Sequence, residues 1–437
     1  MPTSLKTKAH IASTILFAPG FFDAVAGRVA LQRVSRNKEH YSAQPAGSNR
    51  KRTWTTLKGA LHVHSDYSDG AGTIPEIMEA ARNAGIDFVL LSDHNTNKPA
   101  QDGWEEQYSQ TPMLVTSTEL TLKPRSYLMA LDMPSDWNPV VKQAPQTAIN
   151  EINHRGGFSL VCLPFDMKSS WQHWDSEGYA GFEIINFSTI ARRHLNPVSL
   201  FWIARRYKKY GCCTALRSLA TRPDKELALW DRLTRNGRRI VGIASLDAHA
   251  ILKVWGRRYS IPSYEDAFRT LTTQVLVPAT AGVGPNRREI LDGLRAGRCF
   301  MVYECNGDAR EFSFTAEAWR GEAVMGQTLE CSGMVRFRAS APGRSLIKLL
   351  RNGRVVATSD TGQLEHEDNE QGAYRVEAYT YQKKIGPLYL GVRSWIFSNP
   401  IYVQRPALEV QTNGPLFRRT PAPKPDQTPR NAGITPR

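Results

Sequence analysis

The sequence predicts an α/β domain followed by an all-β domain. Over residues 56–305, apolar strand-like runs alternate with helix-like segments, which is typical of a mostly parallel sheet covered by helices. Over residues 309–405, short apolar alternations recur between turn signals, which is typical of a β-sandwich. A chain of 437 residues is also too long for one ordinary hydrophobic core, so two domains with tails are expected.

The two ends of the chain carry most of its net charge of +15. Residues 1–58 hold ten Lys or Arg against two Asp or Glu, and residues 405–437 hold six against two. The middle is nearly balanced, so the charge favours basic termini near membrane lipid or nucleic acid over a basic active groove. Residues 406–437 are rich in Pro, Thr, Asn and Arg and are expected to be a disordered tail.

The basic N-terminal segment, residues 1–55, has two interpretations. Lys6 and Lys8 precede an apolar run and a small-residue pair, which outlines a secretory signal or an anchor. The run is shorter than the ~20 residues of a spanning helix, so an amphipathic helix on the protein or on a membrane surface is the alternative. Residues 36–53 are expected to be a linker, and a cytoplasmic, an exported and a membrane-associated location all stay open.

The segment 59–96 concentrates the side chains that suit a metal centre. His62 and His64 alternate with aliphatic residues, so a strand would place both imidazoles on one face. Thr73 and Gly85 suit the start and end of a helix, and the buried strand that follows leads into His94. Strand, helix and strand in this order predict a parallel βαβ unit whose histidines meet at one edge. Histidine and carboxylate are the usual ligands of a hydrolytic metal.

The later elements continue the α/β pattern to residue 305. The expected strands are 113–119, 127–133, 158–164, 181–186, 239–247, 274–277 and 300–303, and the expected helical stretches are 145–155, 197–237, 264–271 and 286–296. In the all-β region, Asn352-Gly353 predicts a two-residue hairpin.

The order HxH at 62–64, SDG at 68–70 and SDHN at 92–95 resembles the PHP family of metal-dependent phosphoesterases. The resemblance implies a distorted (β/α)7 barrel with two or three divalent ions at the carboxyl ends of its strands. It also implies a Glu at position 119, shared by two metals, and a final Asp-x-His, here 247–249. Some members carry a C-terminal sandwich that ends in a segment similar to 395–400.

The resemblance implies seven metal ligands, of which His94 and Asp247 are also the expected catalytic residues. One metal would bind His62, His64, Glu119 and Asp247, and another would bind Asp69, His94 and His249. Asp93 is expected to orient a ligand histidine. Zinc, manganese and iron all stay open.

One position departs from the family pattern. Where the family ends the strand 158–164 with a ligand His before Pro, this chain has Leu163. Leucine cannot bind a metal, so two ions are expected and the third is in question. His173 would either replace the missing ligand or simply pack. Beyond the next strand, Asn186, Arg192 and Arg193 are the expected substrate-binding residues, because a basic cluster suits a phosphate; a solvated helix start is the alternative.

These predictions favour a metal-dependent hydrolase that cleaves a small phosphomonoester or phosphodiester with a metal-activated water. A hydrolase of another ester or of a glycosidic bond, and a degenerate barrel without turnover, are the alternatives. A nucleic-acid substrate is not supported, because the sequence of the barrel indicates no aromatic and basic platform that would bind it. The sequence has no P-loop, and its six cysteines form no CxxC pair, which argues against a zinc finger or a redox motif. The oligomeric state does not follow from the sequence.

Overall fold

The computed structural model describes residues 54–406, except 195, 255–256, 260–261, 280–283 and 320. The described residues up to Arg405 cluster as one compact unit. Predictions for residues 1–53 and for the tail beyond 406 lie outside the described residues. Among the described helices, none has the length and apolar character needed to span a membrane.

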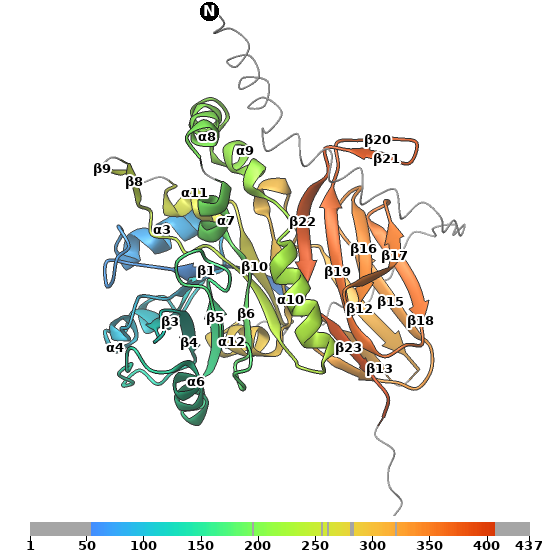
Figure 1. Ribbon diagram of the computed structural model, residues 1–437, viewed down its shortest axis with the longest axis horizontal. Coiled ribbons are helices and arrows are strands. Elements are labelled where there is room, and N and C mark those ends of the chain that lie inside the picture. Colours follow the sequence, from blue (N-terminus) through green and yellow to red (C-terminus); the bar gives the residue numbers. More distant parts are fainter. Residues whose placement is uncertain are drawn as a thin grey trace, which may run out of the picture. The chain divides into compact units, whose positions relative to one another are not determined.

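The first region is mixed α/β (Figure 1). Its strands are β1 (Trp54–Val63), β2 (Phe88–Leu91), β3 (Met113–Thr121), β4 (Tyr127–Leu131), β5 (Phe158–Cys162), β6 (Gly181–Asn186), β7 (Val241–Ser245), β8 (Leu252–Val254), β9 (Arg257–Tyr259), β10 (Thr272–Pro278) and β11 (Cys299–Val302). Its helices are α3 (Ile74–Ala84), α4 (Lys98–Gln101), α5 (Trp104–Gln107), α6 (Pro145–His154), α7 (Phe187–His194), α8 (Pro197–Tyr210), α9 (Cys212–Leu216), α10 (Asp224–Arg235), α11 (Tyr264–Phe268) and α12 (Arg287–Ala296), with 3-10 turns η1 (Arg217–Leu219) and η2 (Glu304–Asn306).

The predicted βαβ unit is present. Thr73 and Glu76 form a capping box at the start of α3, and Gly85 ends the helix with φ +68°. Buried Ile77 and Ala81 lie on the inner side of α3, and β1 pairs in parallel with β2. The carboxyl ends of these two strands therefore lie side by side, as the sequence predicts.

The sheet runs in the order β10-β1-β2-β3-β4-β5-β6-β7. Pairing is parallel except at β4, which is antiparallel to β3 and β5, and between β10 and β1. Just past β7, the Leu246 amide donates to the Leu61 carbonyl at 2.9 Å and the Ala248 amide donates to the His62 carbonyl at 3.0 Å. The chain after β7 thus returns to β1. The α/β class is confirmed, whereas the (β/α)7 form stays a prediction.

The C-terminal region is a large β-sheet region, as predicted. Its strands are β12 (Ser313–Ala318), β13 (Gly321–Val324), β14 (Thr328–Glu330), β15 (Val335–Ser340), β16 (Leu346–Arg351), β17 (Arg354–Ser359), β18 (Gln363–Asp368), β19 (Gly372–Thr380), β20 (Lys383–Ile385), β21 (Leu388–Leu390), β22 (Arg393–Ser398) and β23 (Ile401–Gln404). Phe337 of β15 and Tyr374 of β19 belong to different sheets and stack with ring centroids 4.1 Å apart. Asn352 (φ +50°) and Gly353 (φ +80°) form the predicted hairpin turn between β16 and β17.

The α/β and C-terminal regions share one sheet, because β11 pairs with β22. A buried ion network also joins them. The Arg375 guanidinium donates to Asp231 of α10 at 2.7 and 2.8 Å and to Glu377 at 2.6 Å. The domain boundary predicted between residues 305 and 309 stays a prediction, because strands on its two sides, β11 and β22, are hydrogen-bonded to each other.

Candidate metal centre

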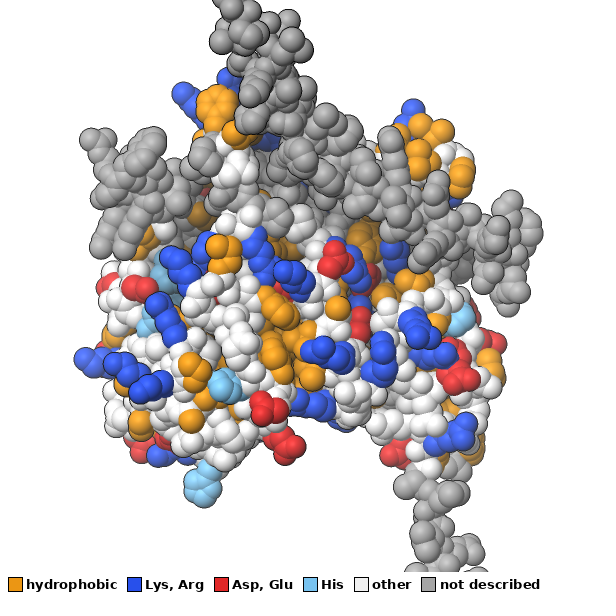
Figure 2. All heavy atoms as spheres, in the orientation of Figure 1, with side chains coloured by type: hydrophobic (Ala, Val, Ile, Leu, Met, Phe, Trp, Pro, Cys, Tyr) orange, Lys and Arg blue, Asp and Glu red, His pale blue; other side chains and the backbone are white. Residues whose placement is uncertain are grey.

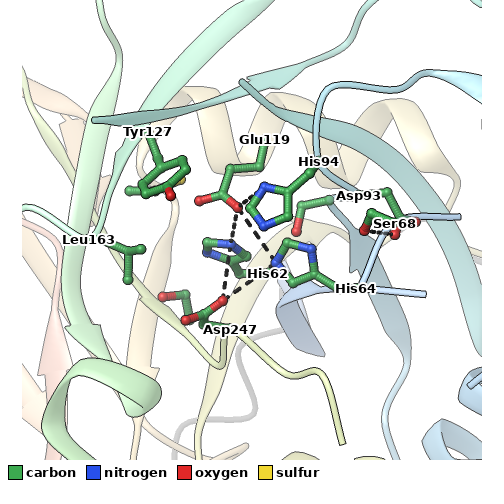
Figure 3. A network of polar contacts seen from close by, with 12 residues as sticks. His62, His64, Ser68, Asp93, His94, Glu119, Tyr127, Leu163 and Asp247 are labelled. Atoms are coloured by element: carbon green, nitrogen blue, oxygen red, sulfur yellow. Dashed lines mark hydrogen bonds and ion pairs between the residues drawn. The ribbon is translucent and has the colours of Figure 1, made fainter. Parts of the chain in front are cut away.

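Four predicted ligands form an inner group: His62 of β1, His64 just past β1, Glu119 of β3, and Asp247 just past β7 (Figure 3). The Glu119 Oε2 atom lies 3.4 Å from His62 Nε2 and 3.6 Å from His64 Nε2. The Asp247 Oδ1 atom lies 3.8 and 3.5 Å from the same two nitrogens. None of the four side chains is more than 7% exposed. The group is therefore compact and closed to water.

The other three predicted ligands, Asp69, His94 and His249, form an outer group. Asp69 Oδ1 lies 3.1 Å from His249 Nε2, and Asp69 Oδ2 lies 3.7 Å from His94 Nε2. The Asp69 side chain is 57% exposed. The two groups touch, because His94 Nδ1 lies 3.0 Å from Glu119 Oε2 and His64 Nδ1 lies 3.7 Å from Asp69 Oδ1. All seven predicted ligands are thus brought together.

Backbone irregularities aim the inner side chains. The β1–β2 register shifts between Leu61 and Val63, so His62 is the extra residue of a bulge, with φ +63°. Asp247 has φ +53° and Leu163 has φ +50°, which is uncommon for residues other than glycine. Such strain collects where surrounding structure over-determines a site. The two imidazoles of His62 and His64 therefore meet in one group because of the bulge at His62, which the alternation of the sequence does not display.

The inner group fits a bound cation. Buried side-chain atoms normally have hydrogen-bond partners, because an unpaired buried polar atom costs free energy. Several atoms of the inner group have none: Nε2 of His62, both ring nitrogens of His64, and both carboxylate oxygens of Glu119. Nδ1 of His94, in the adjoining outer group, has none either. A divalent ion with nitrogen and oxygen ligands would satisfy atoms of this kind. The residues present therefore suit a metal, and His, Asp and Glu side chains do not distinguish among zinc, manganese and iron.

Neighbouring charges keep the inner carboxylates ionised. Burial raises the pKa of Glu119, but the charge of His62 and the nearby His94 imidazole outweigh it and hold the pKa well below its usual value. Burial also raises the pKa of Asp247, but the His64 imidazole and the charge of His62 prevail and keep it well below the ordinary value. Both carboxylates are therefore negatively charged near neutral pH.

Glu183 of β6 is a site residue that the sequence reasoning missed. Its carboxylate lies 2.5 Å from His62 Nδ1 and accepts hydrogen bonds from the Leu163 amide at 2.7 Å and from Asn186 Nδ2 at 3.0 Å. It therefore fixes the His62 ring with Nε2 toward Glu119. The available signal was a carboxylate in the middle of the apolar run GFEIIN.

Leu163 lies at the edge of the inner group, next to Tyr127 and Asp247 in the view of Figure 3. Its side chain is buried and offers no ligand atom. His173 does not take its place: the His173 ring packs edge-on against Trp171, with centroids 6.0 Å apart. This agrees with the packing interpretation of His173.

The expected role of Asp93 needs correction. Its carboxylate accepts hydrogen bonds from the Ser65 amide (2.9 Å), the Ser65 hydroxyl (2.6 Å) and the Ser68 hydroxyl (2.5 Å). Asp93 therefore holds the loop that carries Asp69, and Glu183 is the residue that orients a histidine.

The three expected substrate-binding residues separate. Arg192 reaches the inner group, with Nη2 3.4 Å from Asp247 Oδ2, and it is about half exposed. Arg193 pairs with Glu226 at 2.9 Å and donates to the Phe165 carbonyl, so the structure directs it away. Asn186 is buried and its amide group is used within the protein, toward Glu183, Ser245 and the Thr189 amide. Of the three, Arg192 alone both contacts the inner group and keeps an exposed side chain.

Residues 60–144 match the family model described as PHP domain. The matched segment contains five of the seven predicted ligands and ends before Asp247 and His249. The resemblance inferred from the motifs is thereby confirmed for this segment of the chain.

Several solved structures are distantly similar to this chain. A two-domain protein containing a predicted PHP-like metal-dependent phosphoesterase from Bacteroides vulgatus ATCC 8482 is 16% identical, with 82% of this chain and 99% of that chain covered and a TM-score of 0.41. PsfC from Pseudomonas syringae PB-5123 is 11% identical, with 55% and 90% covered and a TM-score of 0.35. An amidohydrolase from Chromobacterium violaceum is 13% identical, with 47% and 92% covered and a TM-score of 0.29. Scores this low carry no argument about the chemistry. Comparison with curated proteins gives no match.

Proposed function

We propose that this PHP protein is a metal-dependent phosphoesterase that hydrolyses a phosphomonoester or a small phosphodiester. The observation that carries the proposal is the set of unpartnered buried ligand atoms on His62, His64, His94 and Glu119. A hydrolytic cation would satisfy these atoms, and a protein without one would keep a costly cluster for no physical gain.

The inner group would hold one ion and the outer group another, with Glu119 and His64 lying between them. Divalent ions bound there would lower the pKa of a water molecule and offset phosphoryl charge. The chain's own residues do the positioning. Glu183 fixes the His62 ring, and Asp93 fixes the loop of Asp69.

Arg192 supports an anionic substrate. Its guanidinium lies 3.4 Å from Asp247 and 3.2 Å from Asp166, and it is still about half exposed. A guanidinium can bind two oxygens of a phosphate at once, which suits an ester held beside the inner group. Asp247 contacts both Arg192 and the inner histidines, so it aligns the two parts of the site. His94, in the outer group, is partly exposed and lies 3.0 Å from Glu119.

A substrate panel tests the proposal. Purified protein, with and without a chelator, is offered an aryl phosphate, an aryl phosphodiester, an aryl carboxylic ester and an aryl glycoside. We expect the protein to hydrolyse one of the two phosphate esters, and we expect the chelator to abolish this hydrolysis. The Arg192→Gln change should raise KM more than it lowers kcat. Cleavage confined to the carboxylic ester or the glycoside would replace the proposal with another metal-dependent hydrolase. Metal binding without turnover of any substrate would leave a binding domain, the outcome that Leu163 favours.

A further inference from the structure

Helix α8 presents an unusual surface. Of its 14 residues, Ser199, Ile203 and Tyr207 face the protein: Ser199 is buried, and Ile203 and Tyr207 pack against the core. The Tyr207 hydroxyl also hydrogen-bonds to Asp266 of α11. These three positions are spaced four residues apart, so they form one stripe along the helix. Among the residues of α8 whose burial is described, the other positions are exposed.

The exposed side of α8 begins with large apolar side chains. Phe201 is 60% exposed and Trp202 is 54% exposed, and their rings pack edge to face with centroids 5.6 Å apart. Val198 and Tyr210 are exposed as well. Large exposed hydrophobic side chains are otherwise scattered over the described residues, so their collection on one helix indicates an interaction surface.

Four cations follow on the same helix: Arg205, Arg206, Lys208 and Lys209. All four are exposed, and none pairs with a carboxylate among the described residues. The helix itself contains no Asp or Glu. Figure 2 shows hydrophobic and basic side chains gathered at the top of the view, where Figure 1 labels α8. The surface is thus aromatic at its amino-terminal half and strongly positive at its carboxyl-terminal half.

We propose that α8 docks the protein on an anionic phospholipid membrane. Trp, Phe and Tyr side chains suit the boundary between headgroups and acyl chains, and Lys and Arg suit the phosphates of an anionic lipid surface. Charge complementarity decides the occupant, because this helix offers four exposed cations that meet no carboxylate among the described residues, beside exposed aromatic rings. A single-stranded nucleic acid would instead require aromatic residues interleaved with cations along a groove. The proposal does not depend on the proposed phosphoesterase activity.

Sedimentation with vesicles tests it, using the full chain so that the basic N-terminal residues contribute equally to every variant. The probes are vesicles of phosphatidylcholine alone and of phosphatidylcholine with phosphatidylserine in a three-to-one mixture. The parent should bind the mixed vesicles and bind less as salt rises. Replacing the four cations by Gln should weaken binding roughly 600-fold, since each charge near an anionic surface contributes about fivefold. The pair F201S/W202S should weaken it roughly tenfold.

Trp319→Ser is the matched control, because Trp319 is an exposed tryptophan far from α8 in the sequence. It should bind like the parent, and circular dichroism should show that all variants are folded. Equal binding by the parent and both α8 variants would overturn the proposal and assign any membrane contact to the N-terminal residues. A change of oligomeric state in F201S/W202S, or displacement of vesicles by duplex DNA, would also overturn it, in favour of a second copy or a nucleic acid.

Discussion

The inner and outer ligand groups both consist of histidine and carboxylate side chains, but they differ in their exposure to solvent. His62, His64 and Glu119 are sealed from solvent and have ligand atoms without hydrogen-bond partners. Asp69 is largely exposed, and His249 is partly so. An exposed carboxylate is solvated by water when no ion is bound, whereas a buried unpaired one is not. The proposed inner ion would therefore be needed to stabilise the site, while the proposed outer ion would be free to exchange.

The largest effect is expected from Glu119→Gln, because Glu119 contacts both groups. The change keeps the shape of the side chain and removes its charge. We expect loss of both ions and a fall in kcat of about 10³-fold or more, since metal ions supply several kcal/mol of transition-state stabilisation. Single-turnover assays and metal analysis measure it. Near-normal activity would mean that the inner group does not hold the catalytic ion.

Asp69→Asn should have a smaller effect, confined to the outer group. We expect one ion to be lost, the inner ion to remain and kcat to fall by roughly 10- to 100-fold. The matched control is Asp66→Asn, which changes a carboxylate three residues earlier that belongs to neither group. If Asp69→Asn also stripped the inner ion, the two groups would be one cooperative site and the comparison would fail.

Glu183→Gln probes the residue behind the inner group. The amide can still contact His62 but offers it no charge, so metal affinity should fall about 10- to 100-fold with little change in fold. Competition with a chelator measures the affinity. An unchanged affinity would show that Glu183 serves only to hold the Leu163 amide.

Leu163→His would restore the ligand type that this chain lacks. Histidine tolerates the positive φ at this position better than leucine does, so folding should not suffer. We expect the bound metal to rise by about one ion per chain, with Leu163→Asn as the control that cannot supply an imidazole. A metal content equal to the parent's would mean that the neighbouring residues no longer form a third site.

The smallest effect concerns pH and the metal-free protein. Burial lowers the pKa of His249, but Asp69 at 3.1 Å and the charge of Asp247 outweigh it and raise the pKa to about 9. A raised pKa stabilises the fold below the unfolded value of 6.5, and that stability is lost as the pH rises through about 9. Tm of the chelator-treated protein should therefore fall between pH 6.5 and 9, and less so in His249→Gln. An identical slope in both proteins would contradict the assignment.

The ligands could be predicted from the sequence because residues in a short motif at the end of a strand stay close together in the folded chain. The motifs HxH, SDG and SDHN lie within one βαβ unit, and the cap residues Thr73 and Gly85 mark the start and the end of its helix. The role of Glu183 could not be predicted, since it lies 121 residues from His62. The two meet because β6 pairs with β7 and the chain after β7 hydrogen-bonds back to β1. The bulge at His62 likewise depends on the pairing with β2, which no local pattern encodes.

The basic residues show the same limit. Arg192 and Arg193 are neighbours in the chain, and their sequence context is the same. Helix α7 turns one toward Asp247 and the other toward Glu226, which separates a site residue from a structural one. A rotation of about 100° per residue along a helix decides this, and it becomes visible only once the partners of the helix are known.

Metal content tests the central claim most directly. Protein purified without chelator is analysed by elemental analysis as the parent, Asp69→Asn and Glu119→Gln. We predict about two ions per chain in the parent, about one in Asp69→Asn and none in Glu119→Gln. A parent without bound metal, even after incubation with zinc or manganese, would contradict the reading of the buried unpartnered atoms and with it the proposed phosphoesterase.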